Sequence, residues 1–165
     1  MSVAVVMGSA SDLQVMRPAV EALQELGIDA EVRVLSAHRT PDEALAFARD
    51  AAGRGVRAII AGAGGAAHLA GVLAAVTPLP VIAVPIAVGG LGGLDALLAM
   101  VQMPAGVPVA TVAVNGARNA GLLAARILGL SDPQVADRLA QLREQMADKV
   151  RDADAKVRAE LGTAG

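Results

Sequence analysis

The stretch Ser-Ala-His-Arg-Thr-Pro at residues 36–41 follows a mostly apolar run, residues 30–35, and precedes a pattern with helical spacing. This arrangement predicts a turn that joins a strand to a helix. Thr40 and Glu43 have the spacing of a capping box, which would fix where that helix begins. The histidine and the arginine of the stretch would then lie just ahead of a helix N-terminus, whose free N–H groups favour anions. We therefore expect a phosphate site with a proton carrier beside it.

The alternation of strand and helix continues on both sides of this turn. Short apolar runs predict strands at residues 3–7, 30–35, 58–61, 81–84 and 109–114. Helical spacing predicts helices at residues 13–27, 41–54, 68–77, 94–102 and 117–128. We expect an α/β fold of the flavodoxin-like, doubly wound type, with a five-stranded parallel sheet and helices on both faces. Such a sheet binds its ligand at the carboxyl ends of the strands.

The C-terminal part of the chain predicts one more helix, at about residues 132–161. Ser131 and Gln134 have the spacing of a helix start, and the helix is charged. We expect it to pack on the domain or on a neighbouring subunit, because one stripe of it is apolar: Leu139, Leu142, Met146 and Val150. No repeat or linker divides the sequence, so residues 1–165 are expected to form a single domain.

Charge and cysteine content narrow the classes of function. The 16 acidic and 14 basic residues give a net charge of −2 without a basic block, which argues against a nucleic-acid partner. The absence of cysteine excludes disulfides and thiolate chemistry, and it fits a reducing compartment. The N-terminus lacks the basic stretch and the long apolar stretch of a secretion signal, so we expect a cytoplasmic protein.

The middle of the chain is unusually apolar. Residues 69–94 approach the hydropathy of a membrane span, but prolines at 78, 80 and 85 and several glycines divide them into pieces too short to cross. We therefore expect no membrane span. Phe47 is the single aromatic residue, so the core should consist of small aliphatic side chains. The surplus of apolar surface predicts an oligomer.

Polar side chains gather in the turn after the first predicted strand, residues 8–12. The hydroxyls of Ser9 and Ser11, together with a helix N-terminus, could hold a phosphate. Asp12 could accept hydrogen bonds from ribose hydroxyls. The same residues also fit ordinary helix capping, because Ser9 and Asp12 have capping-box spacing.

The turn after the third predicted strand, residues 62–67, is rich in glycine and is followed by His68. Glycines at such a place often serve only close packing, and a single histidine is more often structural than catalytic. The chain, however, has two histidines, and both follow predicted strands at the edge where this fold binds ligands. His38 is the leading acid/base candidate, because an imidazole titrates near neutral pH.

Several other kinds of site are not indicated. Two histidines with neither cysteine nor carboxylates at ligand spacing argue against zinc or another metal. No serine has the sequence context of a nucleophile elbow. The glycines form neither a dinucleotide fingerprint nor a P-loop.

Taken together, the motifs resemble the 5-(carboxyamino)imidazole ribonucleotide mutase family of purine biosynthesis. The resemblance runs in register from residue 3 to residue 128 and is carried by residues 8–12 (GSASD), 36–41 (SAHRTP), 61–69 (AGAGGAAHL), 77–82 (TPLPVI), 93–95 (GLD) and 101–104 (VQMP). It implies a flavodoxin-like homo-octamer that uses neither a metal nor an organic cofactor. The implied reaction moves a carboxylate from the exocyclic nitrogen of the imidazole to the adjacent ring carbon.

The resemblance also implies roles for individual residues. His38 would be the proton-transfer residue. The remaining site residues would bind the ribonucleotide, with Asp12 on the ribose and two of the serines helping to hold the phosphate: Ser9, Ser11, Asp12, Ser36, Arg39, Gly64 and His68. Carbon dioxide released from the carbamate would be held in a small apolar pocket until the ring carbon attacks it.

Some positions depart from the family pattern, and two other functions stay open. Ala70 stands where the family usually has proline, Leu13 replaces a common aromatic residue, and residues 87–92 are richer in glycine than usual. One alternative is the related carboxylase, which takes free carbon dioxide and aminoimidazole ribonucleotide. The other is a non-catalytic sensor of a phosphosugar or nucleotide that uses the same turns.

Overall fold

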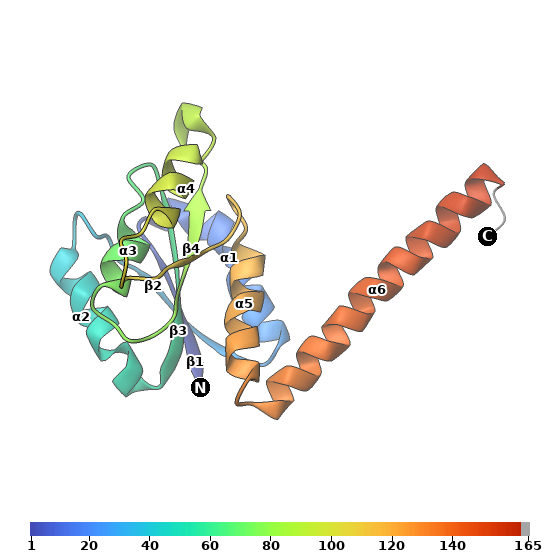
Figure 1. Cartoon of the computed structure of the whole chain (residues 1–165), viewed down its shortest axis with the longest axis horizontal. Helices are drawn as coiled ribbons and strands as arrows, with labels where there is room; N and C mark the ends of the chain where they lie inside the picture. The colour runs from blue at the N-terminus through green and yellow to red at the C-terminus, as the bar shows by residue number, and fades with distance from the viewer. Residues whose placement is uncertain (163–165) are drawn as a thin grey trace.

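A computed structural model describes residues 1–162 of the chain (Figure 1). Its strands are β1 Ser2–Met7, β2 Asp29–Val34, β3 Val56–Gly64, β4 Val81–Ile86 and β5 Ala110–Thr111. Its α-helices are α1 Leu13–Glu25, α2 Pro41–Ala51, α3 Leu69–Ala74, α4 Leu94–Val101, α5 Ala117–Gly129 and α6 Pro133–Leu161. Short 3₁₀ turns are η1 Ala10–Asp12, η2 Ala52–Arg54 and η3 Gly89–Leu91.

The five strands form one parallel sheet in the order β2-β1-β3-β4-β5. This order confirms the predicted flavodoxin-like, doubly wound fold. The direction of winding reverses between β1 and β3, so the crevice of the fold lies at the carboxyl ends of these two strands.

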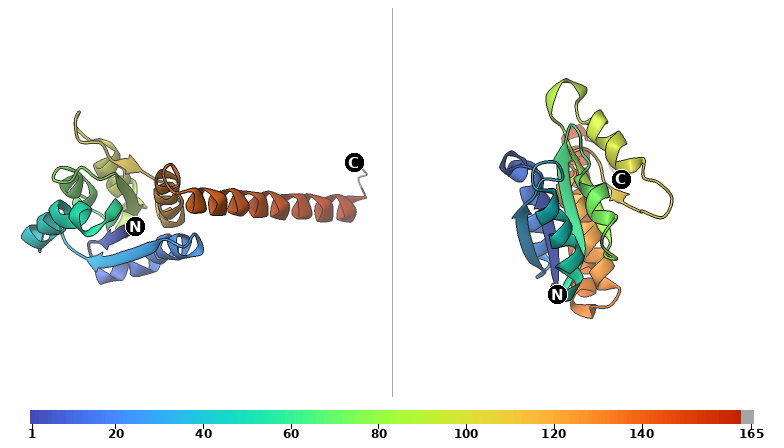
Figure 2. Two further views of the ribbon diagram at one scale, coloured as in Figure 1. Left: turned by 90° about the horizontal axis from the view of Figure 1, so that it is seen from below. Right: turned by 90° about the vertical axis from the view of Figure 1, so that its left-hand side faces the viewer.

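Helices cover both faces of the sheet (Figure 2). Val3, Val5 and Met7 of β1 lie in one core cluster with residues of α1 and α5. Ala4 and Val6, which point to the other face, lie in a second cluster with residues of α2, α3 and α4. The apolar run of β1 is therefore buried on both sides, as expected for a central parallel strand.

Helices α1 and α5 approach each other closely because small residues line their contact. A Cβ placed on Gly121 of α5 would lie 2.7 Å from the carbonyl oxygen of Ala19 on α1 and 3.0 Å from the Cβ of Ala22. A larger side chain at position 121 would push the helices apart. This contact shows how a chain with one aromatic residue still fills its core.

One edge strand is shorter than the sequence predicts, and the other is mostly exposed. β5 was expected at residues 109–114, but its ladder covers only Ala110–Thr111. Val112 N and Asn115 N still donate to β4, to the carbonyl oxygens of Ala83 and Pro85. Pro85 has no N–H to return on that side, so the ladder stops. On the opposite edge, β2 is mostly exposed.

Helix α6 begins one residue later than the Ser131 start that was predicted. Asp132 is the N-cap, and its carboxylate accepts hydrogen bonds from Gln134 N and Val135 N at 3.0 and 3.3 Å. Ser131 Oγ instead donates to the carbonyl oxygen of Leu128 at 3.3 Å. The carboxylate of Asp132 caps the helix, and its negative charge also interacts favourably with the positive N-terminal end of the helix dipole.

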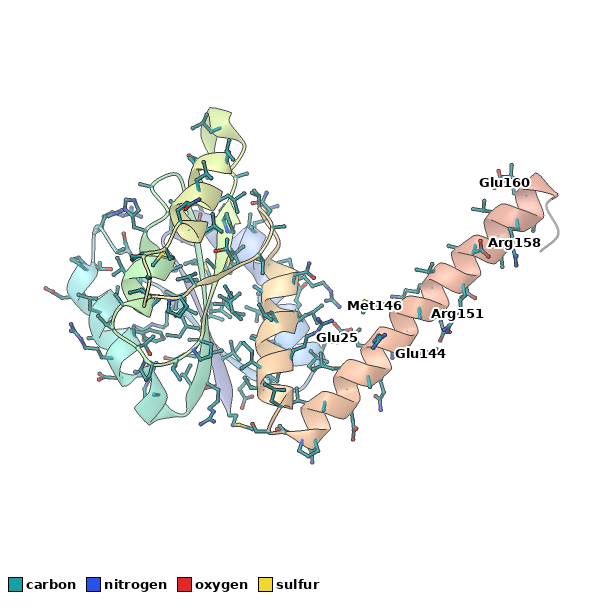
Figure 3. The ribbon with its side chains drawn as sticks, viewed as in Figure 1. Glu25, Glu144, Met146, Arg151, Arg158 and Glu160 are labelled. Atoms are coloured by element: carbon teal, nitrogen blue, oxygen red, sulfur yellow. The ribbon has the colours of Figure 1, made fainter. Side chains whose placement is uncertain are left out.

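Only the first turns of α6 pack on the domain. Val135 and Leu142 are buried, whereas Met146 and Val150 are 43% and 68% exposed. Beyond the contact the helix projects away from the sheet (Figure 1), and its labelled side chains lie along this free part (Figure 3). There Arg151 lies 2.7 Å from both Glu144 and Asp148, ion pairs within the helix itself. The apolar stripe thus packs on the domain of its own chain only at its N-terminal end, and the predicted alternative of packing on a neighbouring subunit stays a prediction.

Among residues 1–162, no helix combines the length and the hydropathy needed to cross a membrane. The apolar segment at residues 69–94 is divided between α3, β4 and the start of α4.

Candidate active site

A cavity of about 180 Å³ lies at the carboxyl ends of β1, β2 and β3. The turns after these three strands converge there, as predicted for a doubly wound sheet. Its walls are polar on the side of the first two turns and apolar on the side of the third: Gly8, Ser9, Asp12, Ser36, Ala37, His38, Arg39, Ala63, Gly64, Ala66, Leu69 and Val88.

The turn after β1 is held by a capping box around η1. Ser9 N donates to Asp12 Oδ2 at 3.1 Å, and Ser9 Oγ accepts from Ser11 N at 3.3 Å. Ser11 Oγ donates to Ser9 Oγ at 2.9 Å. The capping interpretation of these residues is therefore confirmed, and Ser9 and Asp12 line the cavity as well. Ser11 is not among the lining residues.

Asp12 is the one polar side chain that this turn buries, with 8% of its surface exposed. Burial raises the pKa of its carboxyl above the ordinary value of 3.8. Hydrogen bonds from the Ser9 backbone and from Ser11, together with the nearby Arg39 guanidinium, act in the opposite direction. A buried carboxylate at a cavity wall is suited to accept hydrogen bonds from a ligand's hydroxyls.

The turn after β2 is closed by Ser36 and Thr40. Ser36 Oγ accepts hydrogen bonds from His38 N at 3.4 Å and Arg39 N at 3.1 Å. Thr40 Oγ1 accepts from Ser36 N at 3.0 Å and donates to the Ser36 carbonyl at 3.3 Å. The predicted capping box of Thr40 and Glu43 is wrong, because the Thr40 hydroxyl is used within the turn and makes no bond to α2. The helix nevertheless begins at Pro41 as predicted.

Arg39 joins the first turn to the second. Its Nη2 donates to the carbonyl oxygen of Gly8 at 3.0 Å, and its Nε lies 3.5 Å from Ser36 Oγ. The guanidinium is exposed beside the cavity and keeps further N–H groups for a ligand.

The two histidines of the chain meet beside the cavity. His38 Nε2 lies 2.8 Å from His68 Nδ1, and the ring planes meet at 87°. His38 lines the cavity, whereas His68 is not among the lining residues. His68 was predicted to be the first residue of a helix, but it is the N-cap of α3, which begins at Leu69.

Gly64 lies where the end of β3 passes closest to the end of β4. A Cβ on Gly64 would lie 2.7 Å from Val88 Cγ2 and 2.9 Å from the carbonyl oxygen of Ile86. The close approach requires glycine and brings the third turn against the cavity. Within residues 1–162, no three histidine or carboxylate side chains are grouped as a metal ion would require.

A family model described as AIR carboxylase matches residues 2–149. The chain belongs to this family. It is 59% identical over 155 residues to the N5-carboxyaminoimidazole ribonucleotide mutase of Mycobacterium tuberculosis, covering 94% of this chain and 89% of that one. It is 54% identical over 145 residues to the chloroplastic phosphoribosylaminoimidazole carboxylase of Vigna aconitifolia, covering 88% of this chain but 26% of that protein.

Among solved structures, PurE from Treponema denticola has a TM-score of 0.86 to this chain. The two are 30% identical, and the match covers 93% of this chain and 96% of that one. The resemblance stated from the motifs is therefore confirmed, and the fold is that of the AIR carboxylase family.

An apolar pocket was expected from the resemblance, but the residues that form its wall were not named among the site residues. Ala63, Ala66, Leu69 and Val88 line the cavity, and none of them carries a reactive group. Val88 follows β4 directly, so the rule that placed the other turns at the carboxyl edge of the sheet would also have placed this residue there.

Proposed function

We propose that this member of the AIR carboxylase family converts 5-(carboxyamino)imidazole ribonucleotide to 5-amino-4-imidazolecarboxylate ribonucleotide in purine biosynthesis. One observation carries the proposal: His38 projects into a cavity walled on one side by hydroxyls and a guanidinium and on the other by small apolar side chains. The high identity to a relative named as the mutase supports it.

The polar wall is suited to the phosphoribosyl part of the substrate. Ser36 Oγ already accepts two backbone N–H groups, so its own proton is left to donate to a phosphate oxygen. Arg39 adds N–H donors and positive charge. The hydroxyl of Ser11, which donates to Ser9 Oγ at 2.9 Å, would turn to donate to the phosphate instead. Ser9 and Asp12 would bind the ribose, with the buried Asp12 carboxylate accepting from its hydroxyls.

In the proposed reaction His38 gives one proton to the exocyclic nitrogen and later takes one proton from the ring carbon. When the bond between the exocyclic nitrogen and the carboxylate carbon breaks, the electron pair stays on nitrogen, which takes a proton from His38. The products are carbon dioxide and an electron-rich aminoimidazole. Its ring carbon then attacks carbon dioxide, and His38 removes the proton from that carbon to restore aromaticity. The proton count is balanced, and neither ATP nor a redox partner is needed.

The apolar wall has the task of keeping carbon dioxide next to the ring. Ala63, Ala66, Leu69 and Val88 offer it no competing hydrogen bonds and exclude water. Gly64 lines the cavity, and its backbone N–H would donate to the new carboxylate. Holding the two fragments together converts recombination into an effectively intramolecular step.

A homo-octamer in the cytoplasm is the proposed working form. The exposed apolar residues of α4 and the loop before it form a face of the protomer, which we call the α4 face: Leu91, Leu94, Leu98 and Val101, 49–66% exposed. The cavity of one protomer is also smaller than the roughly 300–1,000 Å³ of typical ligand sites, which favours completion by a neighbouring copy. Contact through the α4 face would provide that copy.

The assay that tests the function is ATP-free isomerisation by the purified protein. We expect turnover of 5-(carboxyamino)imidazole ribonucleotide without added bicarbonate. The Vigna aconitifolia relative is named as a carboxylase, so aminoimidazole ribonucleotide with bicarbonate is the second substrate to supply. Turnover of that pair, with none of the carbamate, would replace the mutase by the carboxylase.

A further inference from the structure

The contact between the two imidazoles constrains where their protons lie. His38 Nε2 and His68 Nδ1 are 2.8 Å apart, a hydrogen-bond distance. A neutral imidazole carries one N–H and one lone pair, so one ring must donate and the other must accept. Two arrangements are possible, and they differ in which nitrogen of His38 remains available to a substrate.

In one arrangement His68 Nδ1–H donates to His38 Nε2. The proton of neutral His38 would then lie on its Nδ1, and its single lone pair would already be engaged by His68. The ring could not take a proton from a substrate without breaking this hydrogen bond. In the other arrangement His38 Nε2–H donates to His68 Nδ1, and the Nδ1 lone pair of His38 is free.

We propose that His68 is a positioning residue whose Nδ1 accepts the Nε2–H of His38, so that Nδ1 of His38 is the atom that exchanges the proton with substrate. The inference rests on the proposed function, because it uses the need of His38 for a free lone pair. It names the nitrogen of His38 that exchanges the proton, and it gives His68 the role of orienting His38 in place of contacting the substrate.

The placement of His68 agrees with an indirect role. Its ring contacts His38, but it is absent from the side chains that line the cavity. Its backbone is held firmly: His68 N donates to the Ala66 carbonyl at 2.9 Å, and Val72 N donates to the His68 carbonyl at 3.0 Å. The neighbours on both sides, Ala67 and Leu69, are 1% and 2% exposed. His68 itself is exposed, as His38 is, so the held backbone fixes the position from which its ring accepts the hydrogen bond of His38.

The hydrogen bond also survives the proton cycle. When His38 gains a proton, the proton enters at Nδ1, and Nε2–H continues to donate to His68. The ring therefore keeps one orientation in its acidic and basic forms. Pre-oriented acid/base groups lose less activity to misplacement than free ones.

The first test is the tautomer, measured by ¹⁵N NMR on protein with labelled histidine at a pH where both rings are neutral. The chain has two histidines, so the spectrum contains few signals, and His38→Asn assigns those of His68. We expect His38 to carry its proton on Nε2 and to show an unprotonated Nδ1. A proton on Nδ1 of His38 would overturn the proposal.

The second test compares two substitutions of His68. His68→Leu removes the acceptor, and we expect kcat to fall about 10- to 100-fold with little change in KM, the range seen when the orienting partner of a functional histidine is lost. His68→Asn places an amide oxygen where Nδ1 was, and we expect it to restore most of the lost kcat. Equal kcat values for the two variants, with both melting like the parent protein, would also contradict the role.

The experiments distinguish a failure of the proposed isomerase function from a failure of the positioning role of His68. A parent protein without isomerase activity refutes the proposed function, and the NMR experiment still decides the tautomer. An active parent protein with the Nδ1–H tautomer, or with an unaffected His68→Leu variant, refutes the role of His68 alone.

Discussion

Arg39 donates from Nη2 to the carbonyl oxygen of Gly8 at 3.0 Å, and this bond ties the turn after β2 to the turn after β1. The two turns are the polar wall of the cavity. One guanidinium can thus set the distance between the hydroxyls that would hold a phosphate in the proposed function, and its Nη1 remains to donate to that phosphate.

Replacing Arg39 with lysine should weaken substrate binding. Lysine keeps the charge but cannot donate to Gly8 and to a phosphate from one planar group. A charge-assisted hydrogen bond contributes about 1.5–3 kcal/mol, so KM should rise about 10- to 100-fold. Initial-rate kinetics would measure this. Arg57→Lys, at an exposed position near the start of β3, is the matched control; similar KM values for both variants would contradict the role of Arg39.

Asp12→Asn tests the cost of burying a carboxylate. Because burial raises the pKa of Asp12, the folded state binds the proton more tightly than the unfolded state, whose value is near 3.8. The parent protein therefore loses stability as pH rises through the folded pKa and regains it as pH falls toward 3.8. The asparagine variant lacks this dependence. Urea unfolding at several pH values should show that the free energy of unfolding of the parent protein rises relative to that of the variant as pH falls. If the difference between the two free energies stays constant with pH, the predicted direction of the pKa shift is wrong.

Gly64→Ala should destabilise the protein and distort the cavity. Its Cβ would lie 2.7 Å from Val88 Cγ2 and 2.9 Å from the Ile86 carbonyl, and the backbone atom cannot move aside cheaply. Overpacking of this kind costs about 1–3 kcal/mol of the free energy of unfolding. Gly53→Ala is the control, because nothing lies within 4 Å of a Cβ there. Equal urea midpoints for the two variants would show that the Gly64 contact is not tight.

Leu98→Glu tests the α4 face as a contact between subunits. Leu98 is 49% exposed in the protomer, and a charge buried between subunits without a partner opposes association. We expect the mass in solution to fall below that of the parent assembly, as measured by light scattering. Leu130→Glu makes the same change at a residue that is 88% exposed and lies outside this face. If Leu130→Glu lowers the mass in solution and Leu98→Glu does not, the contact between subunits is not made by the α4 face.

The sequence predicted the sheet and the helices that cover it better than the extent of the edge strand β5 and the packing of the C-terminal helix α6. Apolar runs separated by helical spacing identified all five strands of the parallel sheet, and the pattern is strongest in β1, β3 and β4, which are buried on both faces. The shortness of β5 was missed because it depends on Pro85 of the neighbouring strand, a tertiary relationship. The apolar stripe of α6 continues past the point where the domain ends, so its packing on a neighbouring subunit, the other alternative, stays a prediction.

In the candidate site, residue types were easier to predict than their partners. His38, Arg39 and Asp12 were identified by chemistry and by their place after strands, and all three line the cavity. The Thr40 cap was wrong because the hydroxyl has a closer partner in the Ser36 backbone, which spacing alone does not reveal. The hydrogen bond between His38 and His68 joins residues 30 positions apart and depends on the end of β3, so no local pattern indicates it.

The most direct test of the central claim, that His38 carries the proton, is to measure turnover and ligand binding together in His38→Asn. Asparagine keeps a polar side chain of similar reach but cannot exchange a proton near neutral pH. We predict that the variant binds the ribonucleotide with a Kd close to that of the parent, while kcat in the ATP-free isomerisation falls at least about 100-fold. A variant that binds and still turns over at the parental rate would contradict the claim.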